Sequence, residues 1–206
     1  MLPAEYSNAG FWHKPDRQPK GDETADKLYQ AVGYTLSRWE EMEVVYSNLF
    51  AALVESKSGA ALRAYGSIGS AYGRKQALKD AASVYFLHGR EELAVEFEDL
   101  AEAFGYAAAR RNEIAHGVAV NYAAHDVIGG GYYLIAAAYN TKRNDIGIDF
   151  GMVTYDPYTW NQTTYAYNSS QILEFSNRFE RMGREVSNFI RGMRVFQLTV
   201  QKNPES

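Results

Sequence analysis

Residues 169–200, SSQILEFSNRFERMGREVSNFIRGMRVFQLTV, carry the clearest periodic pattern in the chain. Apolar side chains recur there at intervals of three and four residues, which is the spacing of one face of an α-helix. Ser169 or Ser170 is suited to cap the N-terminus of such a helix. The pattern predicts one long helix over 169–201 whose apolar face packs against the rest of the protein. That face consists of Ile172, Phe175, Phe179, Met182, Val186, Phe189, Met193, Phe196 and Val200.

A second long helix is predicted near the start of the chain. Asp22 is a suitable N-cap, and apolar residues recur at the same helical spacing as far as Ser56. No proline lies between Lys20 and Asp156, so nothing of that kind interrupts a helix in this region. The acidic residues in the middle of this helix are expected on a solvent-exposed flank, and they are Glu40, Glu41 and Glu43.

Two further helical blocks lie between these helices. Residues 59–88 are rich in alanine and glycine, and they predict one or two tightly packed helices with a break near Gly66–Gly69. Residues 90–116 carry an apolar stripe beside an acidic face, and Gly117 is a typical residue at the end of a helix. The chain is therefore predicted to be all-α, with its helices arranged as a bundle.

The helical pattern is interrupted over residues 118–167. Tyrosine, threonine, isoleucine and asparagine become frequent, and we expect an irregular insertion that contains two to four short strands. The best candidates for strands are residues 132–138 and 146–154. The single helical domain is then expected to span residues 22–202, with this insertion inside it.

Ahead of the domain, residues 1–21 mix proline, glycine and charge. We favour a partly ordered arm for this segment. The alternative is that Phe11 and Trp12 fasten the arm onto the body or onto a partner chain.

Composition narrows the classes of function. The chain has 206 residues, of which 46% are hydrophobic, so it can form a substantial core. It has no cysteine, which excludes disulfides, thiolate metal sites and cysteine nucleophiles. The net charge of −4 excludes a generally basic nucleic-acid-binding protein but allows a local basic site. We find no apolar run of membrane-spanning length and no signal-peptide pattern, and we expect a cytoplasmic protein.

One short segment combines residues that can perform acid–base chemistry on a phosphate. Residues 110–117 read RRNEIAHG and fall at the predicted end of a helix. The His116 imidazole can move a proton near neutral pH, and the Arg111 guanidinium can neutralise a phosphodiester. Asn112 lies four residues before His116, on the same helix face, and is placed to orient the imidazole. Taken by spacing alone, the alternative is that Arg111 and His116 cap the carbonyls of the last turn.

This segment resembles the signature of HEPN domains, in which an arginine and a polar residue are followed, after three more residues, by a histidine. The sequence RNEIAHG is close to the RNxIAHG form of many prokaryotic members. The surrounding order of helices is also similar, with Trp39 in an early helix and Arg74 in the second. The resemblance covers most of residues 22–200 in layout and is specific at residues 110–117.

The resemblance implies an up-and-down helical bundle that pairs as a homodimer. In active members the two motifs meet at the dimer interface and cleave RNA without a metal or another cofactor. Carried over by position, Arg111 would stabilise the phosphate, His116 would act as general acid or base, Asn112 would support them, and Arg110 would bind substrate. Such proteins serve in toxin–antitoxin and anti-phage systems, so a cognate antitoxin or sensor is an expected partner.

The resemblance has departures, and other functions stay open. Val118 stands where many toxins of this kind carry a tyrosine that their antitoxin modifies. The leading hypothesis is a metal-independent endoribonuclease, for which Arg111 and His116 must point into a shared, solvent-reachable cleft across a two-fold axis. The second is a non-catalytic RNA- or nucleotide-binding or sensor module that acts through dimerisation. The third is a structural protein, for which His116 would be buried and hydrogen-bonded to backbone.

Overall fold

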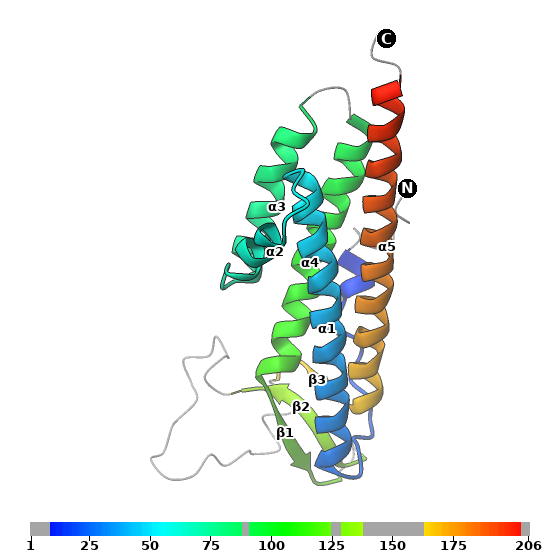
Figure 1. The fold of residues 1–206 in the computed structure, drawn as a ribbon. Helices are drawn as coiled ribbons and strands as arrows, with labels where there is room; N and C mark the ends of the chain where they lie inside the picture. The colour runs from blue at the N-terminus through cyan, green and yellow to red at the C-terminus, as the bar shows by residue number, and fades with distance from the viewer. Residues whose placement is uncertain (1–8, 88–90, 125–128, 138–162, 203–206) are drawn as a thin grey trace. The chain divides into compact units, whose positions relative to one another are not determined.

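The protein is mainly α-helical with one small antiparallel sheet. The computed structural model describes residues 9–87, 91–124, 129–137 and 163–202. The helices are a short 3-10 helix, η1 (Ala9–Trp12), and then α1 (Ala25–Leu53), α2 (Gly59–Gly66), α3 (Ala71–Tyr85), α4 (Glu91–His116) and α5 (Ser169–Lys202). The strands are β1 (Gly117–Tyr122), β2 (Gly131–Ala136) and β3 (Ala166–Tyr167) (Figure 1). Within the described residues, no helix is both long enough and apolar enough to cross a membrane.

The four predicted helical blocks are confirmed. The alanine- and glycine-rich block is two helices, α2 and α3, and the break falls between Gly66 and Ala71 as expected. Each of these two helices begins at a serine whose side chain accepts a backbone N–H, Ser58 for α2 and Ser70 for α3. Gly117 follows the last residue of α4 and begins β1, so the predicted end of that helix is also confirmed.

The contacts divide the chain into two compact units. The helical unit comprises residues 1–13, 38–109 and 177–206, and the sheet unit comprises residues 14–37 and 110–176. Three helices, α1, α4 and α5, contribute residues to both units. The prediction of one domain over residues 22–202 stays a prediction.

Aromatic side chains from three helices form the centre of the helical unit. Here α4 runs in the direction opposite to α1 and α5 (Figure 1). The ring of Trp39, from α1, lies 5.6 Å from that of Phe104 in α4 and 5.4 Å from that of Phe179 in α5. Tyr46 is fully buried beside Phe104, and its hydroxyl donates a hydrogen bond of 3.0 Å to the carbonyl of Leu100. These contacts join the apolar faces that the sequence pattern predicts.

The described part of the N-terminal arm is attached to the helical unit. Trp12 is 2% exposed, and its ring stacks on that of Phe179 at a centroid distance of 5.9 Å. An Nη1 of Arg178 donates to the carbonyl of Phe11 at 2.7 Å. The expectation of a partly ordered arm is therefore wrong at Phe11 and Trp12, because an indole ring buried in an aromatic core fixes the backbone around it. Residues 1–8 lie outside the described residues.

The sheet unit is built on β2. This strand pairs antiparallel with β1, in the register Gly117↔Ala136 to Tyr122↔Gly131, and with β3 through Leu134↔Tyr167 and Ile135↔Ala166. The predicted strand at residues 132–138 is confirmed as β2, one residue earlier at its start. The predicted strand at residues 146–154 lies outside the described residues. Side chains of Val120, Tyr122, Tyr133, Ile135 and Ala166 form the core of the sheet.

The segment before α1 also pairs with β2, through Asp22 and Tyr132. Asp22 and Tyr132 exchange two backbone hydrogen bonds, of 2.9 and 2.8 Å. The Asp22 carboxylate accepts bonds from the backbone N–H and the hydroxyl of Ser169, at 2.6 and 2.5 Å. The expectation that Asp22 caps the first helix is therefore wrong, since α1 begins at Ala25 and the carboxylate binds the start of α5 instead.

The N-cap of α5 is Asn168, one residue before the serines expected there. Its Oδ1 accepts the backbone N–H of Gln171 at 3.1 Å, and the Gln171 Oε1 accepts the backbone N–H of Asn168 at 3.1 Å. This reciprocal pair is a capping box, which satisfies two donors of the first turn at once. The Ser170 hydroxyl binds the Asn168 side chain and does not cap the helix itself.

Candidate functional site

The RRNEIAHG segment forms the last turns of α4 and the first residue of β1. The change from helix to strand occurs at Gly117 without an intervening loop. A Cβ atom at this position would lie 2.6 Å from Cγ of Leu134 in β2, closer than two carbon atoms can approach. The absence of a side chain at Gly117 therefore lets the end of α4 pack directly on the sheet.

Glu113 is the most connected residue of the segment. Its carboxylate lies 3.2 Å from an Nη1 of Arg110 and 3.0 Å from the Nζ of Lys14, and it accepts the hydroxyl of Tyr167 at 2.7 Å. The Glu113 and Arg110 side chains are only 17% and 14% exposed, so these charge-assisted bonds are shielded from water. Burial, and next the adjacent Glu113 carboxylate, raise the pKa of Tyr167 well above its usual value, which keeps this hydroxyl a donor.

One further hydrogen bond fixes the backbone at this point, and two ring contacts lie beside it. The Tyr165 hydroxyl donates to the carbonyl of Glu113 at 2.9 Å. The Tyr165 ring stacks on that of Tyr167 at 4.8 Å, and Lys14 lies over the Tyr165 ring at 5.4 Å. The last turn of α4 is thus held by the N-terminal segment and by the chain leading into β3. The role of Glu113 was not predicted from the sequence, because its partners lie far away in the chain.

Arg111, Asn112 and His116 lie in the last two turns of α4, and Arg111 and His116 are about 140° apart around an ideal helix axis. His116 and Asn112 are exposed, and Arg111 is half-buried. An Nη1 of Arg111 donates to Oδ1 of Asn112 at 3.2 Å, whereas Nε of Arg111 is buried without a hydrogen-bond partner. Within the described part of the chain, no residue forms a hydrogen bond or ion pair with the His116 imidazole. The sequence spacing predicted that Asn112 contacts His116. In the structure, Asn112 contacts Arg111 instead.

The exposure of His116 counts against the third hypothesis. A histidine that merely caps the helix was expected to be buried and bonded to backbone carbonyls, and His116 is neither within the described structure. An exposed imidazole is compatible with both the ribonuclease and the binding module, and the shared cleft and the pocket around Arg111 that they respectively require stay predictions. Arg110 differs from Arg111, because its guanidinium is bound to Glu113 and its Nε is buried without a hydrogen-bond partner.

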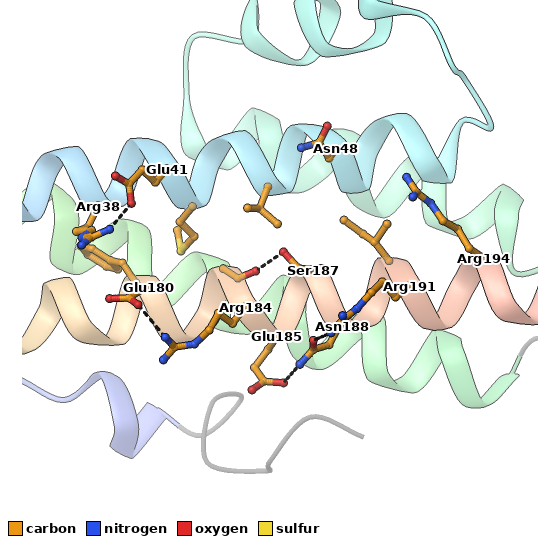
Figure 2. A pocket seen from close by; sticks show the side chains of 15 residues that line it. Arg38, Glu41, Asn48, Glu180, Arg184, Glu185, Ser187, Asn188, Arg191 and Arg194 are labelled. Atoms are coloured by element: carbon orange, nitrogen blue, oxygen red, sulfur yellow. Dashed lines mark hydrogen bonds and ion pairs between the residues drawn. The ribbon is translucent and has the colours of Figure 1, made fainter.

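A groove of about 900 Å³ lies between α1 and α5 in the helical unit (Figure 2). Its apolar lining consists of Met42, Val45, Phe179 and Ile190. Arginines and acids alternate around it, and two of the arginines are neutralised: Arg38 lies 2.6 Å from Glu41, and Arg184 lies 2.7 Å from Glu180. These charges balance closely, so the groove does not select one class of ligand.

The arginines of α5 do not form one continuous basic face. Arg178 and Arg181 both lie over the ring of Phe11, at 5.3 and 5.6 Å. Arg191 hydrogen-bonds to Asn188 at the groove, where Arg194 also lies (Figure 2). In the helical unit, then, the arginine-rich last helix is partly occupied in attaching the arm and partly in local ion pairs.

A buried polar cluster lies elsewhere in the helical unit. Glu43 is 6% exposed, pairs with an Nη1 of Arg74 at 2.8 Å and accepts the hydroxyl of Tyr65 at 3.2 Å. The expectation that Glu43 belongs to a solvated flank is wrong, because Arg74 and Tyr65 provide the partners that let a carboxylate be buried. Burial raises the pKa of Glu43, and the bond to Arg74 opposes that shift. Its partners are structural, so this cluster is not a second candidate site.

Among the described residues, no three side chains of histidine, aspartate or glutamate gather closely enough to hold a metal ion. In comparisons with known proteins, no family model, no curated protein and no solved structure matches the chain. The functional assignment therefore rests on the residues at the end of α4.

Proposed function

We propose that the protein is a metal-independent endoribonuclease of the HEPN type, with Arg111 and His116 as its catalytic residues. The observation that carries this proposal is the exposed His116 imidazole, which lies five residues after Arg111 in the end of α4 that the partners of Glu113 attach to the sheet. The ribonuclease hypothesis requires both side chains to be reachable by a phosphodiester. The resemblance of RRNEIAHG to the HEPN signature and the mainly helical fold support the same function.

The reaction needs only groups that these residues supply. A neutral imidazole takes the proton of a ribose 2′-hydroxyl, and the resulting oxygen attacks the adjacent phosphorus. The bond from phosphorus to the 5′-oxygen breaks, and a protonated imidazole returns a proton to that leaving oxygen. The products are a 2′,3′-cyclic phosphate and a 5′-hydroxyl. Arg111 neutralises the charge that builds up on the phosphoryl oxygens, and Asn112 holds the Arg111 guanidinium.

One copy of the chain supplies one His116 to this reaction, whereas the reaction uses a base and an acid. A homodimer that brings two copies of the α4 end together provides both, and it is part of the proposal. RNA is the proposed substrate, and a cognate antitoxin or sensor protein is a proposed partner. Toxin or anti-phage activity is the corresponding cellular role.

The test is cleavage of varied RNAs by the purified protein in EDTA, with the product ends identified. We expect cleavage that leaves 2′,3′-cyclic phosphates. His116→Ala and Arg111→Ala are each expected to reduce the rate by about 100-fold or more. Matched controls are His13→Ala and Arg63→Ala, which remove an exposed histidine and an exposed arginine far from the segment in sequence. These two variants are expected to cleave like the wild type.

Two results would change the conclusion. Binding of RNA that depends on Arg111, without turnover in a folded dimer, would identify the non-catalytic binding module instead. Cleavage that survives His116→Ala would exclude this residue as the acid or base.

A further inference from the structure

The charged residues of the α4 end fall into two groups. Asn112 and His116 are exposed and Arg111 is half-buried, whereas the Arg110 and Glu113 side chains are largely shielded from water and Glu113 contacts Tyr167 of the sheet. Glu113 holds three partners from three parts of the chain: Arg110 from α4, Lys14 from the N-terminal segment and Tyr167 from β3. Capping of the helix explains none of these contacts.

We propose that Glu113 is the positioning residue of the Arg111–His116 site, and that Arg110 acts through Glu113 and not on the substrate. The proposal rests on the proposed ribonuclease function. It replaces the expected substrate-binding role of Arg110, whose guanidinium is already bound in the structure.

Geometry gives the reason. Glu113 and His116 are three residues apart, so their side chains are neighbours on the helix surface. A Glu113 carboxylate without its partners is therefore within reach of the imidazole and would compete with a phosphate for it. Arg110, Lys14 and Tyr167 hold the carboxylate on the sheet side instead, and Tyr165 fixes the carbonyl of Glu113. The cluster thus keeps His116 free and orients the turn that carries it.

Precise orientation matters because a small displacement of a catalytic group has a large effect on rate. A misplacement of about 1 Å costs roughly 100-fold in rate. A loss of positioning lowers kcat and leaves KM nearly unchanged, whereas the loss of a substrate contact raises KM. The two roles of Arg110 can therefore be distinguished by kinetics.

The experiment compares Tyr167→Phe and Glu113→Gln with Tyr132→Phe in RNA cleavage. Tyr132→Phe is a matched control, since it removes a hydroxyl from the same sheet, and no described residue bonds to the Tyr132 hydroxyl. We expect Tyr167→Phe and Glu113→Gln to lower kcat by about tenfold or more with little change in KM. Tyr167→Phe leaves Arg110 and Lys14 bound to the carboxylate, so it measures the contribution of the Tyr167 hydrogen bond alone.

A double-mutant cycle tests Arg110. If Arg110 acts through Glu113, the double variant Arg110→Gln/Glu113→Gln is no slower than the slower single variant. A rise in KM on Arg110→Gln that adds to the effect of Glu113→Gln would overturn the proposal, because it would place Arg110 on the RNA.

Failure of the inference differs from failure of the function. Wild-type rates for Tyr167→Phe and Glu113→Gln, together with an inactive His116→Ala, overturn the positioning role and leave the ribonuclease intact. If the wild type cleaves no RNA, hydrogen exchange of the backbone amides of residues 111–116 tests whether the Glu113 cluster orders this segment. Faster exchange in Tyr167→Phe than in Tyr132→Phe then shows that the Glu113 cluster orders the end of α4 although the function has failed, and equal exchange overturns that ordering as well.

Discussion

Gly117 occupies the junction on which the candidate site depends. Its missing side chain allows α4 to pass into β1 against Leu134, and even a methyl group would meet that side chain at 2.6 Å. The positions of Arg111 and His116 therefore depend on a residue that performs no chemistry. This is the reason to regard the glycine as part of the site's framework.

Gly117→Ala is expected to lower the free energy of unfolding by about 1–3 kcal/mol, because the added methyl overpacks the junction. Gly33→Ala is the matched control, since Gly33 lies inside α1 and a Cβ atom added there would have no neighbouring atom within 4 Å. That control is expected to raise the free energy of unfolding by about 0.5–1 kcal/mol through helix propensity. Urea denaturation measures both, and equal effects at the two glycines would contradict the packing argument.

Glu43 predicts a pH dependence of stability. Because the pKa of Glu43 is raised in the folded protein, chiefly by burial, the folded state keeps this proton to higher pH than the unfolded state does. The contribution to stability is complete below pH 4.5, the ordinary value, and is lost as the pH rises through the folded pKa. Over that window, the free energy of unfolding is expected to fall less with pH in Glu43→Gln than in the wild type.

Urea denaturation at a series of pH values tests this prediction. Glu91→Gln, at an exposed position, serves as the control and is expected to follow the wild type. Identical slopes for Glu43→Gln and the wild type would show that Glu43 does not cause the dependence.

At the scale of the element, the capping box of α5 sets where the longest helix starts. Asn168→Ala removes the side-chain acceptor of the Gln171 N–H and is expected to cost about 1 kcal/mol of stability. Asn177→Ala, at an exposed position inside the same helix, is expected to leave stability unchanged or slightly increased. Thermal unfolding of the two variants distinguishes the effect of the cap from that of helix propensity. A similar loss of stability in both variants would contradict the assignment of Asn168 as the N-cap.

Helices were predictable from the sequence and the sheet was less so. The spacing of Ile172 to Val200 depends only on the 3.6-residue period, and Gly66 and Gly117 mark helix ends by their own backbone preferences. Gly117 marks the end of α4 but does not predict a strand after it, and residues 117–122 become a strand because β2 lies beside them. The helices can therefore be predicted from neighbouring residues in the sequence, whereas β1 depends on a partner strand.

The candidate site divides in the same way. The position of Arg111 and His116 at the end of a helix followed from the sequence, because both residues lie just before Gly117. The roles of Arg110 and Glu113 did not follow, since Tyr167 lies 54 residues from Glu113 along the chain. Asp22 illustrates the same limit, because a carboxylate before a helix fits an N-cap equally well until its partner Ser169 is known.

At the scale of the whole molecule, buried tyrosines predict loss of stability in alkali. Burial is the main cause that raises the pKa of Tyr133 to about 12, with Asp22 nearby, and burial also raises the pKa of Tyr46, Tyr65 and Tyr167. The unfolded chain releases these protons near pH 10, so the stability they contribute is present below that pH and declines above it. Between its unfolded and folded pKa values, each such tyrosine makes the free energy of unfolding fall by about 1.4 kcal/mol more per pH unit.

Tyr133→Phe is expected to make this slope shallower by the amount of one tyrosine, as measured by urea denaturation between about pH 10 and 12. Tyr72→Phe is the control, because Tyr72 is 79% exposed. An equal decrease in the two variants would contradict the role of burial.

The segment before α1 has a consequence for synthesis of the protein. Asp22 and Ser169, which bond to each other, are separated by 147 positions, and Lys14 reaches Glu113 beside Tyr167. A ribosome makes residues 14–22 early and their partners in β3 and α5 late. The growing chain therefore cannot close the Glu113 cluster until residues 163–171 have left the exit tunnel. If the protein has the proposed nuclease activity, a site that matures only then is inactive on the messenger RNA and ribosome that produce it.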